Sequence, residues 1–206
     1  MKMRRKVSML LVALAAVAVM IPIGSASAAL NPNLSQVITA GTQSVDIVDG
    51  AGLAVGSPSV AFGATTFSFA CETSTATLGT ASQKIRVKNP KKAGIKIDIN
   101  TPTPATDAWT SGGNSYKYND ATGAGCTNGQ MTISGGSLAK LTGANNPVYT
   151  MPVGAFDGTS SVTLLNNTSA TAYEADLTNY TLSQNIPAEQ ADGAYSLPMN
   201  ITYVQQ

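Results

Sequence analysis

The chain has 206 residues, with twelve basic and eleven acidic side chains and a formal net charge of +1. It contains no histidine, which excludes Ser-His-Asp and Cys-His hydrolysis and removes the commonest metal ligand. No P-loop, dinucleotide-binding fingerprint or zinc-ligand spacing is present. We therefore predict that the protein is not an enzyme and has no cofactor.

A secretory signal peptide is predicted over residues 1–28. Four basic side chains lie within residues 1–6, an uncharged apolar run follows over residues 7–23, and Ala26 and Ala28 form an A-x-A cleavage pattern. The alternative is a retained membrane anchor, but an apolar run of about 17 residues is at the short limit for crossing a bilayer. We expect cleavage after Ala28 and a protein that is secreted or displayed at the cell surface.

Removal of residues 1–28 changes the charge of what remains. Residues 29–206 keep eight basic and all eleven acidic side chains, which gives a net charge of −3. A weakly acidic chain argues against nucleic acid as the partner. No proline run or charge block divides these residues, so we predict a single domain over 29–206.

Short strands are expected throughout the mature chain, because apolar residues recur with a period of two and turn residues separate them. The expected strands cover residues 36–40, 45–49, 65–70, 83–88, 95–99, 115–118, 130–134, 137–141, 160–165, 172–183 and 195–204. Residues 83–88 and 95–99 are predicted to form a hairpin around the turn at residues 89–94. Pro198 suggests an edge or a bulge in the last strand. The fold class is all-β, an antiparallel β-sandwich of the Ig-like or Greek-key type with long loops.

The two cysteines, Cys71 and Cys126, both lie in the exported part of the chain. In an oxidising compartment such a pair is best interpreted as a disulfide. Two free thiols or a metal-binding pair are the alternatives, although a zinc site without histidine would need carboxylates. We predict the disulfide and no bound metal.

Six of the eight basic residues of the mature chain are concentrated in thirteen positions. They are Lys84, Arg86, Lys88, Lys91, Lys92 and Lys96. One hypothesis is a stripe that binds an anionic polymer of the cell envelope. The alternative is an edge strand on which lysines prevent aggregation.

Trp109 is the only tryptophan and lies in a loop rich in glycine. Exposed aromatic rings beside glycine and asparagine can form carbohydrate-binding platforms, whereas a single tryptophan in a β-sandwich more often belongs to the core.

Oxygen-bearing turns occur at Asp46 with Asp49, at Asn119 with Asp120, and at Asp157 before Gly158. They raise the question of a structural calcium ion, but none has the spacing of a known calcium loop. Hydrolysis by a pair of carboxylates is a further hypothesis, because a glycosidase needs only two carboxyl groups at a set separation. The simpler interpretation of the acidic residues is that they are good turn residues and solvated surface groups.

The C-terminal segment resembles a family of secreted proteins. Residues 176–183 (DLTNYTLS) are similar to the Leu-Thr-Trp-Thr-Leu segment of WxL-domain cell-surface proteins, with Tyr180 where the family has tryptophan. Residues 186–195 and 199–203 resemble the closing pattern of that family. The resemblance implies a β-sandwich held non-covalently at the bacterial cell wall. We therefore expect a structural or adhesive surface protein whose partner is an envelope polymer or another surface protein.

The same C-terminal segment also resembles pilus subunits of the spore-coat-U type. That resemblance implies polymerisation by donation of a strand to the open sheet edge of a neighbour. Residues 29–39 are the candidate donor, with Leu30, Leu34 and Ile38 as apolar positions and Pro32 as an obstacle to ladder hydrogen bonds. A fibre subunit that associates with itself is thus the alternative function.

Overall fold

The structure is a computed structural model of the chain and describes residues 35–120, 125–143 and 145–206. The predicted signal peptide lies outside these residues. The chain divides into two compact units, Met1–Ile38 and Thr39–Gln206. In the first unit, the described residues 35–38 form no strand and expose the side chains of Val37 and Ile38. None of the helices within the described ranges has the length and apolar character needed to span a bilayer.

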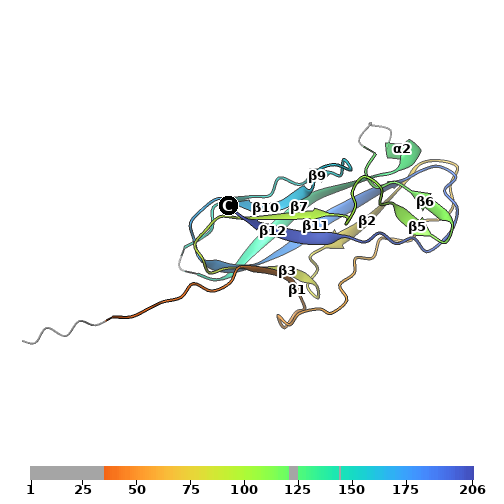
Figure 1. Cartoon of the computed structure of the whole chain (residues 1–206). Coiled ribbons are helices and arrows are strands. Elements are labelled where there is room, and N and C mark those ends of the chain that lie inside the picture. The colour runs from red at the N-terminus through yellow and green to blue at the C-terminus, as the bar shows by residue number, and fades with distance from the viewer. Residues whose placement is uncertain (1–34, 121–124, 144) are drawn as a thin grey trace, which may run out of the picture. The chain divides into compact units, whose positions relative to one another are not determined.

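The second unit is an antiparallel β-sandwich with long loops, as predicted (Figure 1). The larger sheet has the order β1 (Ser44–Val48), β3 (Lys84–Asn89), β11 (Tyr173–Ile186), β7 (Gln130–Thr142) and β9 (Gly154–Ala155), with β2 (Glu72–Leu78) also paired to β11. The smaller sheet has the order β12 (Asn200–Gln205), β4 (Ile95–Asn100), β10 (Val162–Asn167) and β8 (Tyr149–Thr150). Strands β5 (Trp109–Ser111) and β6 (Asn114–Tyr116) form a separate hairpin, and α2 (Gly125–Asn128) is a one-turn helix.

The core lies between the two sheets and is formed by alternating apolar residues. Ile85 and Val87 of β3 are fully buried on one side, and Ile95, Ile97 and Ile99 of β4 are buried on the other. The intervening basic residues of both strands point outward. This alternation confirms the predicted inward and outward faces of both strands.

The predicted hairpin of residues 83–99 is wrong, because β3 and β4 belong to different sheets. Strand β3 pairs with β1 and β11, whereas β4 pairs with β10 and β12. The buried side chain of Asn89 holds the crossing turn: its Nδ2 donates to the carbonyl oxygens of Ala93 (2.7 Å) and Thr171 (3.2 Å). Its Oδ1 accepts a hydrogen bond from Nε2 of Gln43 at 2.7 Å. The turn thus passes from one layer to the other, and the two apolar rows face each other across the core.

Other strand predictions also differ from the structure. Residues 36–40 and 65–70 form no strand, and Phe67 and Phe69 are exposed. Residues 130–134 and 137–141 are parts of the single strand β7. Strand β2 was not predicted, because its inward residues Ser74, Ala76 and Leu78 are mostly small or polar. Pro198 precedes β12, which lies at the edge of its sheet.

The centre of β11 is where this strand changes partner. Its first half pairs with β3 and its second half with β2, and between them Asn179 adopts a φ of 60° and donates its N–H to the carbonyl of Gly79 at 3.0 Å. The next residue, Tyr180, is fully buried and donates its hydroxyl to the carbonyl of Leu164 at 2.9 Å. On the neighbouring strand, Gly136 has a φ of 102° and lies against the ring of Tyr180. A residue without a side chain is required there.

We predict that Gly136→Ala lowers the free energy of unfolding by about 2–4 kcal/mol, because it adds a Cβ against Tyr180 and strains a positive φ. Gly113→Ala is the control, since its Cβ would meet no atom within 4 Å, and we expect it to change stability by less than about 0.5 kcal/mol. Urea unfolding followed by circular dichroism measures both. Equal stability of the two variants would contradict the packing of Tyr180 described above.

Candidate functional site

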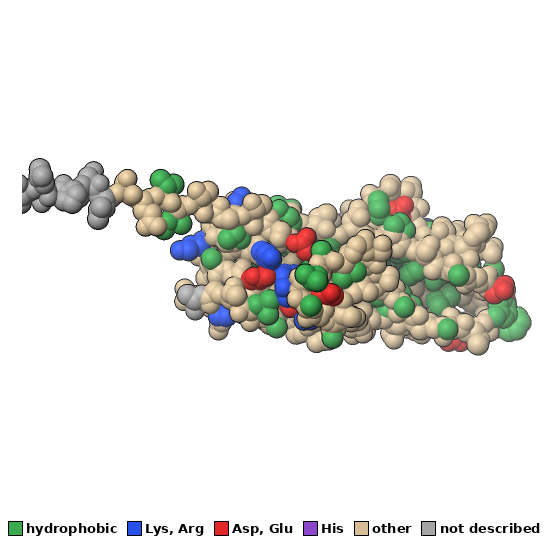
Figure 2. Space-filling model, turned by 90° about the horizontal axis from the view of Figure 1, so that it is seen from below, with side chains coloured by type: hydrophobic (Ala, Val, Ile, Leu, Met, Phe, Trp, Pro, Cys, Tyr) green, Lys and Arg blue, Asp and Glu red, His purple; other side chains and the backbone are tan. Residues whose placement is uncertain are grey.

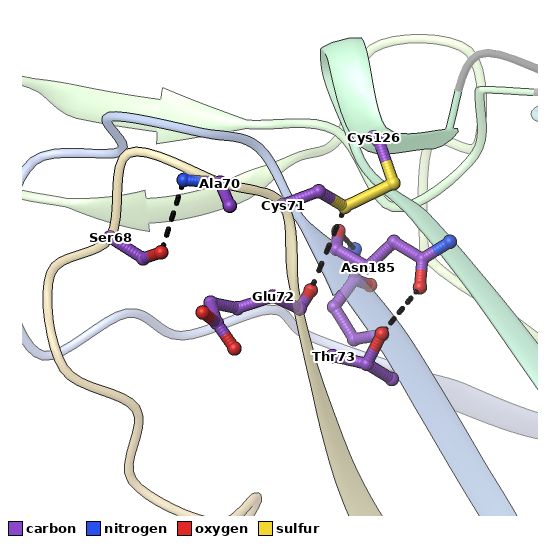
Figure 3. Close-up of a disulfide and its surroundings, with 8 residues drawn as sticks. Ser68, Ala70, Cys71, Glu72, Thr73, Cys126 and Asn185 are labelled. Carbon is purple, nitrogen blue, oxygen red and sulfur yellow. Dashed lines mark hydrogen bonds between the residues drawn. A yellow bond between two sulfur atoms is a disulfide. The ribbon is translucent and has the colours of Figure 1, made fainter.

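A disulfide ties the start of β2 to the helix α2 (Figure 3). Cys71 immediately precedes β2 and Cys126 lies in α2, with their Cα atoms 5.2 Å apart. Beside them, Oγ1 of Thr73 donates to Oδ1 of Asn185 on β11 at 3.1 Å. The predicted disulfide is therefore confirmed, and it anchors the C-terminal end of the long segment that precedes β2.

That segment forms one wall of a hollow of about 450 Å³, which we call the aromatic hollow. Residues 60–68 line it on one side, and residues 186–187, 190–193 and 195 line it on another. The hairpin β5–β6 contributes Trp109 and Tyr116, and β11 contributes Gln184. Loops and strand ends thus converge on one concave site.

Four aromatic rings pack in sequence in and beside this hollow. The ring centroids of Phe62 and Trp109 are 5.3 Å apart, those of Trp109 and Tyr116 are 6.1 Å apart, and those of Tyr116 and Tyr195 are 5.1 Å apart. The Trp109–Tyr116 pair is stacked and the other two pairs meet edge to face. Burial raises the pKa of Tyr116 to about 12.

Trp109 combines the two roles considered from the sequence. It is half-buried and packs against the core, and it also lines the aromatic hollow. Its Nε1 donates to Oε1 of Gln184 at 2.9 Å, and Nε2 of Gln184 donates to the carbonyl oxygens of Lys117 (3.3 Å) and Asn185 (2.7 Å). The indole is therefore held in one orientation by a buried amide whose own groups are satisfied.

Polar groups open to solvent complete the hollow. Glu72 and Asp192 line it with exposed side chains, and neither forms an ion pair within the described part of the chain. In Figure 3 the side chain of Glu72 points away from the disulfide. Tyr195 shapes the opposite wall, because its hydroxyl accepts from Nε2 of Gln190 at 2.6 Å and donates to the carbonyl of Ala191 at 2.8 Å.

Apart from Trp109, the residues of this hollow were not predicted from the sequence. Phe62 and Phe67 come from the segment before β2, Tyr116 comes from β6, and Tyr195 comes from the segment before β12, so only the fold brings these three parts together. Aromatic residues make up only 6% of the chain. Their scarcity was the one signal in the sequence that could have marked these residues as candidates for a binding site.

The six predicted basic residues do not form one surface. Lys84, Arg86 and Lys88 lie on the outer face of β3, whereas Lys96 lies on β4 in the other sheet and contacts Asp98 (Nζ–Oδ2 2.9 Å). Lys91 and Lys92 are exposed in the turn between the two strands. None of the six lines the aromatic hollow. Figure 2 shows basic and acidic side chains lying side by side on one face.

Acidic residues of β11 neutralise the three basic residues of β3. Arg86 donates through Nε to Oδ1 of Asp176 at 2.8 Å and through Nη2 to Oδ2 at 3.1 Å. Nζ of Lys84 lies 3.6 Å from Oδ2 of Asp176, and Nζ of Lys88 lies 3.8 Å from Oε1 of Glu174. The hydrogen bonds from Arg86 are the main cause of a lowered pKa for Asp176. These pairings favour a structural role for the basic residues of β3.

The oxygen-bearing turns hold backbone N–H groups. Oδ1 of Asp49 accepts from the N–H groups of Ala51 and Leu53, both at 2.9 Å. Oδ1 of Asp157 accepts from Thr159 at 2.8 Å and from Ser160 at 2.7 Å, and these bonds lower the pKa of Asp157. Among the residues that the structure describes, no group of three or more Cys, Asp or Glu side chains is placed to hold a metal ion.

Comparison with family models, with curated proteins and with solved structures found no match. The resemblance to WxL-domain proteins therefore stays a prediction from residues 176–203. These residues contribute β11 from Asp176 onward, the wall of the aromatic hollow up to Tyr195, and the first four residues of β12.

We predict that Asp176→Asn lowers the free energy of unfolding at neutral pH by about 3 kcal/mol, because it leaves the partly buried Arg86 without its bidentate partner. The lowered pKa of Asp176 means that its stabilisation is complete above the ordinary carboxyl pKa and is lost as the pH falls through the folded value. The difference between the two proteins should therefore shrink as the pH falls below the ordinary carboxyl pKa of 3.8.

The exposed Asp46, which lies opposite Arg86 on β1, provides the control. We expect Asp46→Asn to change stability by less than about 1 kcal/mol. Urea unfolding at several pH values measures all three proteins. A constant stability gap between wild type and Asp176→Asn at every pH would contradict the role assigned to this ion pair.

Proposed function

We propose that the chain is a non-catalytic, secreted bacterial surface protein, adhesive or structural, that is held non-covalently at the cell envelope by binding a glycan polymer in the aromatic hollow. The observation that carries this proposal is the convergence of aromatic rings and exposed carboxylates in one concave site. The predicted signal peptide and the disulfide support export, because such bonds persist in oxidising compartments.

A glycan fits the chemistry of this site. Sugar rings have apolar C–H faces that pack on aromatic rings, and Phe67 is 56% exposed at the wall of the hollow. Sugar hydroxyls are hydrogen-bond donors, and the carboxyl oxygens of Glu72 and Asp192 can accept hydrogen bonds there. A concave site that combines aromatic rings with a few polar groups is typical of ligand-binding sites.

The environment of the two carboxylates favours binding over hydrolysis. A glycosidase needs one carboxyl group that stays protonated near neutral pH, and burial in an apolar pocket is the usual way to achieve this. Both Glu72 and Asp192 are exposed. The chain also has no histidine to move a proton.

A fibre subunit is the second candidate, and one observation favours it. Val37 and Ile38 are 90% and 85% exposed in a segment that forms no strand. These residues belong to the predicted donor segment, residues 29–39, whose first six residues lie outside the described part of the chain. Deletion of residues 29–39 should abolish any concentration-dependent polymers. A strictly monomeric full-length protein would contradict this candidate.

We predict that Phe67→Ala weakens binding of the mature protein to isolated cell envelopes about tenfold, because it removes one exposed ring from the hollow. Phe69→Ala is a matched control: Phe69 is 80% exposed, its ring centroid lies 5.2 Å from that of Phe67, and it does not line the hollow. Cosedimentation at increasing envelope concentration gives the affinities. Equal losses in both variants would contradict the site.

Fractionation of cells that express the full-length chain tests the wider proposal. We expect the processed protein in the envelope fraction, with release by salt or chaotrope, because the contacts are non-covalent. Recovery only from the culture supernatant would refute envelope retention. Turnover of a glycan that is lost in Glu72→Gln or Asp192→Asn would show instead that the protein is a hydrolase.

A further inference from the structure

Strand β12 forms an open edge of the smaller sheet. Among the described strands it pairs only with β4, and its residues 200–205 include no charged residue and no proline. Tyr203 and Val204 are 41% and 55% exposed. Natural sheets normally protect their edges with charges, prolines, bulges or covering segments. We propose that β12 pairs antiparallel with β12 of a second copy of this chain, with Tyr203 on the two-fold axis.

The hydrogen bonds to β4 determine which backbone groups of β12 are free. The N–H of Gln206 donates to the carbonyl of its opposite residue Gly94 at 2.9 Å. Hydrogen-bonded pairs alternate along an antiparallel ladder, so Val204 and Thr202 also direct their N–H and C=O groups at β4. The backbone groups of Ile201, Tyr203 and Gln205 therefore point away from the sheet.

These outward groups are arranged symmetrically about Tyr203. In an antiparallel pair of two copies, Tyr203 lies opposite Tyr203 of the partner subunit, and Ile201 lies opposite Gln205 of the partner subunit. This register forms up to about six backbone hydrogen bonds. It also places Thr202 opposite Val204 of the partner subunit, a pair of β-branched residues that suits a sheet surface.

The charges that flank β12 are complementary in this register. Val204 lies opposite Lys96 of β4, and Thr202 lies opposite Asp98. On the outer face of the joined sheets, a row of four side chains therefore runs across the strands. It begins with Lys96 and Val204 of one copy and continues with Thr202 of the partner subunit and Asp98 of the partner subunit. No like charges face each other, which favours a second copy over an unrelated strand.

The outer edges of β1 and β7, by contrast, are protected. The outer edge of β1 is covered, because the N–H of Val55 donates to the carbonyl of Ile47 at 2.9 Å. The outer edge of β7 carries Lys140 and bends at Gly135 and Gly136, which both have positive φ. Strand β12 instead is held in place for pairing, because the hydroxyl of Tyr203 donates to the carbonyl of Gln43 at 2.9 Å.

Paired cysteine variants test the register directly. Thr202 and Val204 are exposed on the outer face, so Thr202→Cys and Val204→Cys should leave the fold intact, which circular dichroism checks. In the proposed dimer these two positions lie opposite each other, with Cα atoms about 4.5 Å apart, within the range of a disulfide. Two copies of the same variant place their cysteines about 8 Å apart, which is too far.

We expect mild oxidation of an equimolar mixture of the two full-length variants to yield at least about ten times more cross-linked dimer than either variant alone. Wild type controls for exchange with Cys71 and Cys126, which are already bonded to each other. Equal cross-linking in all samples, or none in the mixture, would overturn the proposal. Cross-linking of Ile38→Cys to Thr202→Cys would overturn it in favour of strand donation.

This test is independent of the proposed function. Phe67→Ala should cross-link as well as the parent when it is combined with each cysteine variant, because Phe67 lines the aromatic hollow and β12 does not contribute to that lining. Sedimentation of the wild type over a range of concentrations should show a dimer that Val204→Lys weakens, since a lysine on an edge strand opposes pairing. A wild type that stays monomeric at every concentration would refute the dimer.

Discussion

Strand β11 determines the register of the larger sheet. It pairs along one edge with β3 and then with β2, and along its other edge with β7. The change of partner at Asn179 needs the turn at Gly79, and the buried ring of Tyr180 needs the bare backbone of Gly136. Because Asp176, Tyr180 and Gln184 all lie on this strand, it positions the ion pairs, the core and the aromatic hollow together.

The two ends of β11 support different kinds of structure. Near its start, Asp176 and Glu174 neutralise the basic residues of β3, so charge that looks functional in the sequence stabilises the outer face of a sheet. Near its end, Gln184 orients Trp109, and the disulfide at Cys71 anchors the segment whose residues 60–68 line the hollow. The binding site proposed for this protein therefore depends on long-range contacts.

The fold class and the inward faces of β3 and β4 were predictable, because a period of two in isoleucine and valine reflects burial on one side of a strand. The strands that pair with β3 and β4 were not predictable. The turn between them crosses from one sheet to the other, and this crossing depends on the contacts of Asn89 with Gln43 and Thr171, which are distant in sequence. The alternation of residues 65–70 wrongly predicted a strand, because Phe67 and Phe69 face solvent in a loop. Only Trp109 of the hollow was a candidate, because the lining comes from three segments that are far apart in sequence, near residues 60–68, 109–116 and 184–195.

The aromatic hollow can be tested most directly through Trp109, the only tryptophan of the chain and one of its lining residues. Its fluorescence should be followed while the mature protein is titrated with soluble fragments of envelope glycan. We predict a saturable change in emission, because a ligand in the hollow replaces water beside the indole. Unchanged emission under conditions in which the protein still binds whole envelopes would contradict this account, because binding would then occur elsewhere on the surface.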